Sequence, residues 1–322
     1  MLHSDTRQLG TNKRAGLLKP FAGMRPGTKL FLLSAPFLLL VFIFSYLPLY
    51  GWIYAFFEYR AGLKIFETKF IGFKYFLSLV NNPVTASEIV RVLRNTFVMS
   101  FLGILTSWMP VAFAIFLSEM RSKKIRGIIQ TLSTLPNFIS WILVYSVVWS
   151  MFSVGDGFLN RLLLTLNLVD TEINFLASTE HVWLTMLGYQ IWKGLGWSAI
   201  MYLAAITSID QEQYEAATVD GAGRFRCIWH ITVPGLMPTY FVLLLLSIAN
   251  FINNGMEQYF VFQNPMNKAF IEVLDLYVYN KGMIGNNIPY ATVVSMLKSI
   301  VSIVLLFTAN KMSKSVRGES IL

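Results

Sequence analysis

The chain has few of the residues that most enzymes use for catalysis. It contains one cysteine and three scattered histidines among 322 residues. The single Cys227 excludes a disulfide framework within the chain, and the histidines show no metal-ligand spacing. No G-x-x-x-x-G-K-[ST] phosphate loop occurs in the sequence. We therefore expect that this chain binds no metal or cofactor and is not a conventional ATPase.

Charged residues are also scarce. They make up 13% of the chain, whereas hydrophobic residues make up 55%, which is too apolar for a soluble domain. Six segments are long enough to cross a bilayer, which takes about 20 residues. Their only Lys, Arg, Asp or Glu residues are Lys193 and Lys298. The segments are residues 30–57, 95–118, 127–154, 181–209, 233–256 and 288–310. The sequence thus predicts an all-α integral membrane protein with six transmembrane helices.

The distribution of basic residues predicts the orientation. Lys and Arg are more numerous in the segments on the side of the two termini, including the short cluster at 121–126. The positive-inside rule therefore places both termini in the cytoplasm. We expect a tail at 1–29, a six-span domain at 30–310 and a second tail at 311–322. Much of the net charge of +9 comes from Lys and Arg residues beside the expected spans, where the orientation in the membrane explains them. The charge therefore gives no reason to expect a nucleic-acid partner.

A polar island at 210–235 separates the fourth and fifth expected spans. Residues 211–220 contain neither Gly nor Pro, so we expect a helix there. Gly221 suits a left-handed helix end, and Pro234 is expected to limit a second helical stretch. The pattern alone also fits an ordinary surface hairpin of two helices.

The order of residues in this island is similar to a motif of a known protein family. The characteristic positions are Glu215, Ala216, Ala217, Asp220, Gly221, Ala222 and Pro234. This order resembles the cytoplasmic EAA loop of permease subunits in type I ATP-binding-cassette (ABC) importers. The resemblance implies the fold of those permeases, with a short coupling helix that docks on an ATPase subunit. Glu215 would then meet a basic group of that partner, and the two alanines would allow close approach.

Other segments are similar to the oligosaccharide branch of this family, which includes the subunits of the maltose importer. They include residues 70–76, 191–206 and the end of the chain, and the likeness extends to permeases of alginate-type importers. It implies a bacterial inner-membrane protein that forms half of a saccharide pathway. The implied partners are a second permease, two ATPase subunits that hold ATP and Mg²⁺, and an extracytoplasmic binding protein.

Three groups of residues in the expected spans are candidates for saccharide contact. They are Trp141, Tyr145 and Trp149; Tyr189, Trp192 and Lys193; and Asn250, Asn253 and Asn254. Aromatic rings pack against the C–H faces of sugars, but aromatic residues also face lipid at membrane interfaces. A lysine within a span normally faces an interior or water, so Lys193 is expected either to contact substrate or to bond helix carbonyls. The asparagines are expected to form a helical stripe that suits sugar hydroxyls or contacts between subunits.

The sequence argues against two other functions of membrane proteins. An ion-coupled carrier would need Asp or Glu near mid-membrane, and the cores of the six expected spans contain neither. An integral membrane enzyme would need a nucleophile–base or metal set, which the sequence does not show. Neither function would explain the EAA order, so an importer permease is the expected function.

Overall fold

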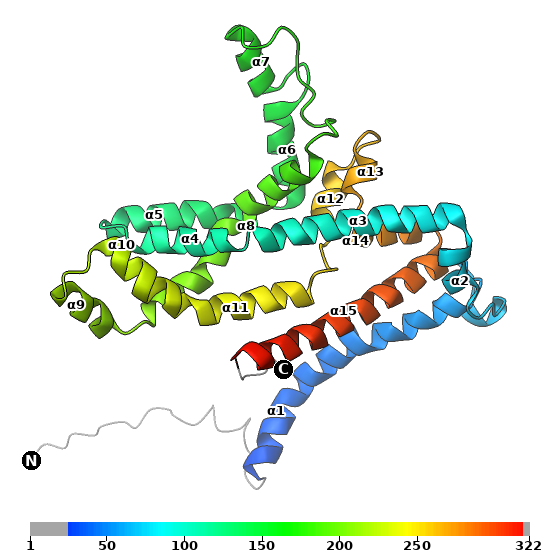
Figure 1. The fold of residues 1–322 in the computed structure, drawn as a ribbon. Coiled ribbons are helices and arrows are strands. Elements are labelled where there is room, and N and C mark those ends of the chain that lie inside the picture. Colours follow the sequence, from blue (N-terminus) through cyan, green and yellow to red (C-terminus); the bar gives the residue numbers. More distant parts are fainter. Residues whose placement is uncertain (1–24, 318–322) are drawn as a thin grey trace, which may run out of the picture. The chain divides into compact units, whose positions relative to one another are not determined.

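The computed structural model describes residues 25–317, and apart from one isolated bridge between Phe57 and Phe70 the regular structure of these residues is helical (Figure 1). Residues 1–24 and 318–322, which hold most of the first expected tail and the end of the second, lie outside the described residues. The chain forms two compact units, Met1–Ile53 and Tyr54–Leu322. Each unit is described by itself.

The described part of the first unit begins with α1 (Pro26–Val41) and continues through a π-helical stretch, η2 (Phe42–Tyr46), into η3 (Leu47–Phe56). Together these elements form one apolar helical run, Pro26–Phe56, that is long enough to cross a membrane. Pro36 lies inside α1. Apolar side chains surround the run, as is typical of a helix in lipid or between apolar neighbours.

The second unit is built around α8 (Val182–Thr207), which packs against α4 (Trp108–Ser118), α5 (Lys123–Thr134) and α11 (Val233–Ala249). The other long helices are α3 (Pro83–Leu105) and α15 (Ile288–Arg317), and α15 packs on α11. The shorter elements are α2 (Lys74–Asn81), η4 (Ile65–Glu67), η5 (Leu135–Phe138), α6 (Trp141–Phe152), α7 (Phe158–Thr165), α9 (Gln211–Val219), α10 (Arg224–Cys227), η6 (Ile228–Thr232), α12 (Glu257–Phe262), α13 (Lys268–Ile271), α14 (Leu274–Tyr279) and η7 (Asn280–Ile284).

The number of membrane spans differs from the expected six. Within the described residues, four helical runs are long and apolar enough to cross a membrane, or five if one bent pair counts as a span. They are Pro26–Phe56, Pro83–Ser118, Arg224–Ala249 and Ile288–Lys314, with the bent pair Lys123–Phe138 and Trp141–Phe152. The fourth expected span is the continuous 26-residue helix α8, whose polar residues include Gln190 and Lys193. The six-span count is therefore not confirmed by length and apolarity.

The third expected span, 127–154, is not one straight helix. Its two parts are bent by 105° between η5 and α6. Pro136 lies at the start of η5, and Ser140 caps a new helix by accepting a hydrogen bond from the Leu143 N–H at 3.4 Å. Proline interrupts the backbone ladder and a serine cap starts a new one, so the apolar run divides into two helices.

A close approach fixes α8 against α5. A Cβ atom at Gly196 would lie 2.3 Å from the backbone of Ser133, so no larger residue fits there without displacing α5. By contrast, a Cβ at Gly188 of the same helix would meet no atom within 4 Å. Glycine at this one position lets the two backbones meet, as small residues do between membrane helices.

A polar network holds α13 and α14 on the start of α3. Glu272 is 2% exposed and pairs with Arg91 at 2.6 Å, while Asn280 donates to its other oxygen at 2.8 Å. The Tyr277 hydroxyl donates to Glu88 at 2.9 Å. Burial raises the pKa of Tyr277, so the hydroxyl stays protonated. This network positions the segment that follows α12, which lines one of the cavities described below.

Candidate functional site

The polar island forms the expected short helix and turn. Asp210 caps α9 by accepting a hydrogen bond from the Glu212 N–H at 3.0 Å. At the other end, Gly221 has a φ of +76°, and the N–H of Ala222 donates to the carbonyl of Ala217 at 2.8 Å. This is the left-handed exit that glycine favours after a helix, and the prediction for Gly221 is confirmed.

The second helical stretch does not end at Pro234, contrary to expectation. The run α10–η6–α11 continues from Arg224 to Ala249. Pro234 has no N–H and its ring obstructs the previous turn. The π-helical stretch η6 absorbs this defect, because the Val233 N–H bonds Ile228 five residues earlier instead of four. The helix therefore widens at the proline and does not stop.

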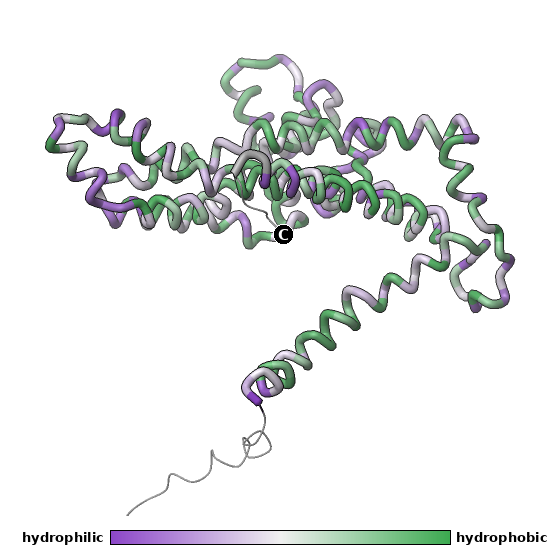
Figure 2. The backbone as a smooth tube through the Cα atoms, turned by 60° about the horizontal axis from the view of Figure 1, so that its bottom comes forward, coloured by the Kyte–Doolittle hydropathy of each residue, from purple (hydrophilic) through white to green (hydrophobic). Residues whose placement is uncertain are grey.

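Two contacts hold α9 on the body of the unit. The Tyr214 hydroxyl lies 3.0 Å from the hydroxyl of Thr232, which is 2% exposed. Gly235 lies so close to Ile209 that a Cβ would come within 2.6 Å of that side chain. Glu215, Ala216, Asp220, Gly221 and Pro234 are exposed, and Ala217 and Ala222 are half-buried. The segment is thus a fixed, projecting surface (Figures 1 and 2).

Sequence reasoning missed three apolar side chains on this surface. Val219, Phe225 and Trp229 are 88%, 89% and 71% exposed, beside the exposed Arg224 and Arg226. Phe225 and Trp229 are four residues apart on one continuous helix, which puts them on the same face. The sequence signal that could have revealed them is the four-residue spacing of Phe225 and Trp229 within a polar loop. Grouped, exposed apolar side chains of this kind mark interaction surfaces.

One cavity lies among α3, α4, α8 and the end of α11. It has a volume of about 620 Å³. Its polar lining includes Ser107, Gln190, Ser198, Ser247, Asn250, Asn253 and Asn254, and its apolar lining includes Trp197 and Met201. We call it the amide cavity. The described residues that line it include no Lys, Arg, Asp or Glu.

The three asparagines do not form the expected helical stripe. α11 ends at Ala249, and residues 250–256 form a non-helical break. The Asn250 side chain donates to the Leu246 carbonyl at 3.0 Å. Asn254 donates to the Ser100 hydroxyl at 2.9 Å, and that hydroxyl in turn donates to the Phe251 carbonyl in the break. The Oδ1 atom of Asn254 is buried without a partner among the described residues. The break turns all three asparagines to the wall of the amide cavity.

The ion pair between Asp275 and Lys298 stabilises this break. Asp275 of α14 accepts a hydrogen bond from the Gly255 N–H at 2.9 Å and pairs with Lys298 of α15. The side chains of Asp275 and Lys298 are 19% and 17% exposed. Lys298 therefore has a structural partner, the simplest role for a lysine in an apolar helix.

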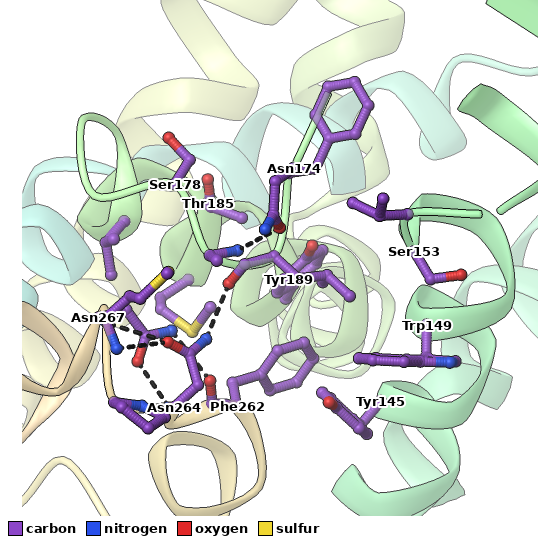
Figure 3. Close-up of a pocket in the computed structure, with 18 residues that line it drawn as sticks. Tyr145, Trp149, Ser153, Asn174, Ser178, Thr185, Tyr189, Phe262, Asn264 and Asn267 are labelled. Atoms are coloured by element: carbon purple, nitrogen blue, oxygen red, sulfur yellow. Dashed lines mark hydrogen bonds between the residues drawn. The ribbon is translucent and has the colours of Figure 1, made fainter. Parts of the chain in front are cut away.

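A second cavity, of about 380 Å³, lies between α6, the start of α8 and the segment after α12. Figure 3 shows its aromatic residues Tyr145, Trp149, Tyr189 and Phe262. The Tyr189 ring stacks on Phe262 with centroids 4.9 Å apart, and Tyr145 meets Phe262 edge-on at 5.1 Å. We call this the aromatic cavity.

Trp141, Trp192 and Lys193 line neither cavity. The Lys193 ammonium donates to the carbonyls of Pro136, Asn137 and Ile139 at 3.0, 2.8 and 2.7 Å. It also lies 5.5 Å from the centre of the Trp141 ring. All three donors of the ammonium thus point to the 105° bend. The sequence left two roles open for Lys193, substrate contact or bonding of helix carbonyls, and this geometry favours the second.

Comparisons with known proteins agree over nearly the whole chain. The profile of the family "Binding-protein-dependent transport system inner membrane component" matches residues 107–317. The chain is 38% identical to Protein LplB of Bacillus subtilis (strain 168), over 93% of each chain. It is 34% identical to the polygalacturonan/rhamnogalacturonan transport system permease protein YteP of the same organism, over 91% of this chain and 89% of that one.

Solved structures also show a likeness to ABC transporters. The chain is similar to a chain in the crystal structure of a bacterial alginate ABC transporter in complex with an alginate pentasaccharide-bound periplasmic protein. The TM-score is 0.81 at 30% identity, over 95% of this chain and 99% of that one. A methionine ABC transporter, MetNI, shares the fold with a TM-score of 0.51 at 15% identity. The chain therefore belongs to the family of binding-protein-dependent transport system inner membrane components, the permease subunits of ABC importers.

Proposed function

We propose that this chain forms half of the path by which an acidic oligosaccharide enters the cell. The observation that supports the proposal is the likeness, over 95% of this chain, to a chain of a bacterial alginate ABC transporter. The relative YteP, named for polygalacturonan and rhamnogalacturonan transport, supports the same substrate class. Alginate, polygalacturonan and rhamnogalacturonan are all polymers that contain uronic acids.

The amide cavity suits a saccharide on that path. Its asparagines, glutamine and serines supply donors and acceptors that match sugar hydroxyls, and Trp197 supplies a flat apolar face. Its volume lies within the range of about 300–1,000 Å³ that is typical of small-molecule sites. The described lining is uncharged, so carboxylates would be held by neutral donors. Lys193 has no part in this proposal, because its three donors are already used.

The projecting surface around α9 is the proposed coupling element. The ATPase would seat α9 in a groove, with Glu215 near a basic group of the partner and Phe225 and Trp229 supplying apolar contact. ATP and Mg²⁺ would be bound by the two ATPase subunits. In the proposed orientation, α9 and both termini face the cytoplasm. The other partners are a second permease and an extracytoplasmic binding protein.

The substrate is tested with the reconstituted importer, containing both permeases, both ATPases and the binding protein. Oligogalacturonides and alginate oligosaccharides are compared with neutral maltooligosaccharides of equal length. We expect transport of at least one acidic series and a strong reduction of it by Asn254→Ala, which removes an amide from the cavity wall. Transport of the neutral series alone would contradict the proposed substrate class.

The coupling element is tested by two matched glycine variants. Gly221 has a φ of +76°, whereas Gly223 has a φ of −76°, and a Cβ would meet open space at both positions. Valine at 221 must adopt a backbone conformation that β-branched residues avoid, but valine at 223 need not. We expect Gly221→Val to reduce ATPase association or substrate-stimulated hydrolysis, with Gly223→Val near wild type. Equal behaviour of the two variants would argue against a rigid turn at 221 in coupling.

A further inference from the structure

We propose that the aromatic cavity is a second saccharide subsite, separate from the amide cavity, that holds one sugar ring of the oligosaccharide. This inference rests on the proposed function. Figure 3 shows that the cavity is formed by α6, the start of α8 and the two loops that carry Asn174 and Asn264. It is a site of different composition from the amide cavity, and the two cavities have no lining residue in common.

The two cavities meet α8 along stretches that overlap. The aromatic cavity is lined between Val182 and Tyr189, and the amide cavity between Leu187 and Tyr202. The buried core that includes Val148, Met186 and Leu187 surrounds this part of α8. The aromatic cavity lies at the end of α8 remote from α9, so a saccharide approaching from that end would meet it first.

The side chains of the aromatic cavity match a sugar ring. A pyranose has apolar C–H faces and hydroxyls at its edge, and aromatic rings present flat apolar surfaces of comparable size. Tyr145 and Trp149 supply two rings from one face of α6, with centroids 6.0 Å apart. Trp149 is 52% exposed, so a ligand can reach it from solvent.

The cavity also retains polar groups for the edge of the sugar. The hydroxyls of Tyr145 and Tyr189 have no hydrogen-bond partner among the described residues, although both residues line the cavity. Asn174 uses its oxygen to accept from the Ala177 N–H at 3.0 Å, which leaves its amide nitrogen available. Apolar rings beside available hydroxyl and amide groups are what recognition of a polyhydroxylated ring requires.

Two other amides in the wall are already occupied, and they serve to shape the cavity. Asn264 donates to the Leu176 carbonyl at 3.0 Å and so ties the segment after α12 to the loop before α8. Asn267 donates to the Phe262 carbonyl at 3.0 Å. These bonds fix the positions of the two loops before any ligand arrives, which lowers the entropic cost of binding.

The lining also predicts how the subsite responds to charge. The described residues that line it contain no Lys, Arg, Asp or Glu. Contacts through ring faces and neutral hydroxyls are screened little by salt, unlike contacts between exposed charges. The subsite should therefore contribute equally to neutral and acidic sugar units, and its contribution should persist at high ionic strength.

The test measures the half-saturating concentration of the saccharide-loaded binding protein for transport by the whole importer in lipid nanodiscs. Trp149→Ala removes a ring of the subsite. Trp192→Ala is the matched control, because Trp192 is 51% exposed and lines neither cavity. Tyr189→Phe keeps the ring and removes only the hydroxyl, so it tests the site without a large packing change.

We expect Trp149→Ala to raise the half-saturating concentration about 3- to 10-fold over Trp192→Ala, the size expected for the loss of one aromatic contact. Tyr189→Phe should raise it about 2- to 5-fold, and both increases should persist at high salt. Equal values for Trp149→Ala, Tyr189→Phe and the control would overturn the subsite. So would an increase that follows the acyl composition of the nanodisc, because it would identify a lipid pocket.

The failure of this inference can be distinguished from the failure of the proposed function. If the wild-type importer carries no acidic oligosaccharide, the proposed substrate class fails. If the wild type carries it, Asn254→Ala reduces transport and the aromatic variants match the control, only the second subsite fails.

Discussion

The role of Lys193 can be tested directly, because this residue of α8 bonds the backbone carbonyls of the bend between η5 and α6. The three carbonyls that it bonds belong to the 105° turn between η5 and α6. Lys193→Met keeps a long, flexible side chain and removes the charge and the donors. The carbonyls of Asn137 and Ile139 then lose the ammonium, while the Pro136 carbonyl still accepts from the Ile139 N–H at 3.2 Å. The helix that carries residue 193 keeps its backbone bonds.

The cost follows from the number of bonds. A hydrogen bond to a charged group contributes about 1.5–3 kcal/mol. The three bonds share one ammonium and are not additive, so we count them as one to two bonds, which gives about 1.5–6 kcal/mol. We therefore expect Lys193→Met to lower the heating midpoint of the detergent-solubilised complex, measured by the loss of the monodisperse size-exclusion peak. Impaired transport should follow from the loss of assembled complex and not from weaker saccharide binding.

The control for charge removal is Lys64→Met, because the Lys64 side chain is 86% exposed and its nearest acidic group is 4.0 Å away. Exposed pairs of this kind contribute about 0–1 kcal/mol, so this variant should behave as wild type. The reasoning would be refuted if Lys193→Met retained wild-type thermal stability while its half-saturating saccharide concentration rose. That result would restore a direct role of Lys193 in substrate contact.

Three further predictions concern packing, charge and docking. Gly196→Ala should lower the thermal stability by about 1–3 kcal/mol or more through overpacking against α5, whereas Gly188→Ala should not, as heating curves of the two variants would reveal. Lys298→Met should destabilise by about 3–5 kcal/mol because it leaves Asp275 unpaired, and adding Asp275→Asn should recover most of the loss; a double variant as unstable as the single one would contradict this. Trp229→Ser should weaken co-purification of the ATPase without changing membrane insertion, and unchanged association would remove this side chain from the docking surface.

The local features of the polar island could be read from the sequence. A helix without Gly or Pro followed by Gly221 predicts a short helix with a left-handed exit, because both rules depend on the residues themselves. The π-helical continuation through Pro234 could not be predicted in this way. It depends on whether the chain beyond the proline is held in line by packing, and here α11 packs against α8 and α15.

The break at Asn250 and the position of Lys193 show why the site was only partly predictable. Residues 233–256 are uncharged and apolar enough to suggest one helix. The partners that stabilise the break, Ser100 and Asp275, are 154 and 20 residues from the positions that they bond. The aromatic residues were correctly expected to cluster on α6, yet only contacts from α8 and α12 decide which of them line a cavity.

The 105° bend has a consequence for how the protein is made. The carbonyls of Pro136, Asn137 and Ile139 leave the ribosome 54 to 57 residues before Lys193, the side chain that bonds them. At a synthesis rate of about 5–20 residues per second, that interval is about 3–11 seconds. During this interval the carbonyls of Asn137 and Ile139 lack the ammonium that bonds them, and unsatisfied carbonyls are costly in hydrocarbon. We therefore expect the bend to reach its final geometry only after α8 has been made and the Lys193 ammonium can bond these carbonyls.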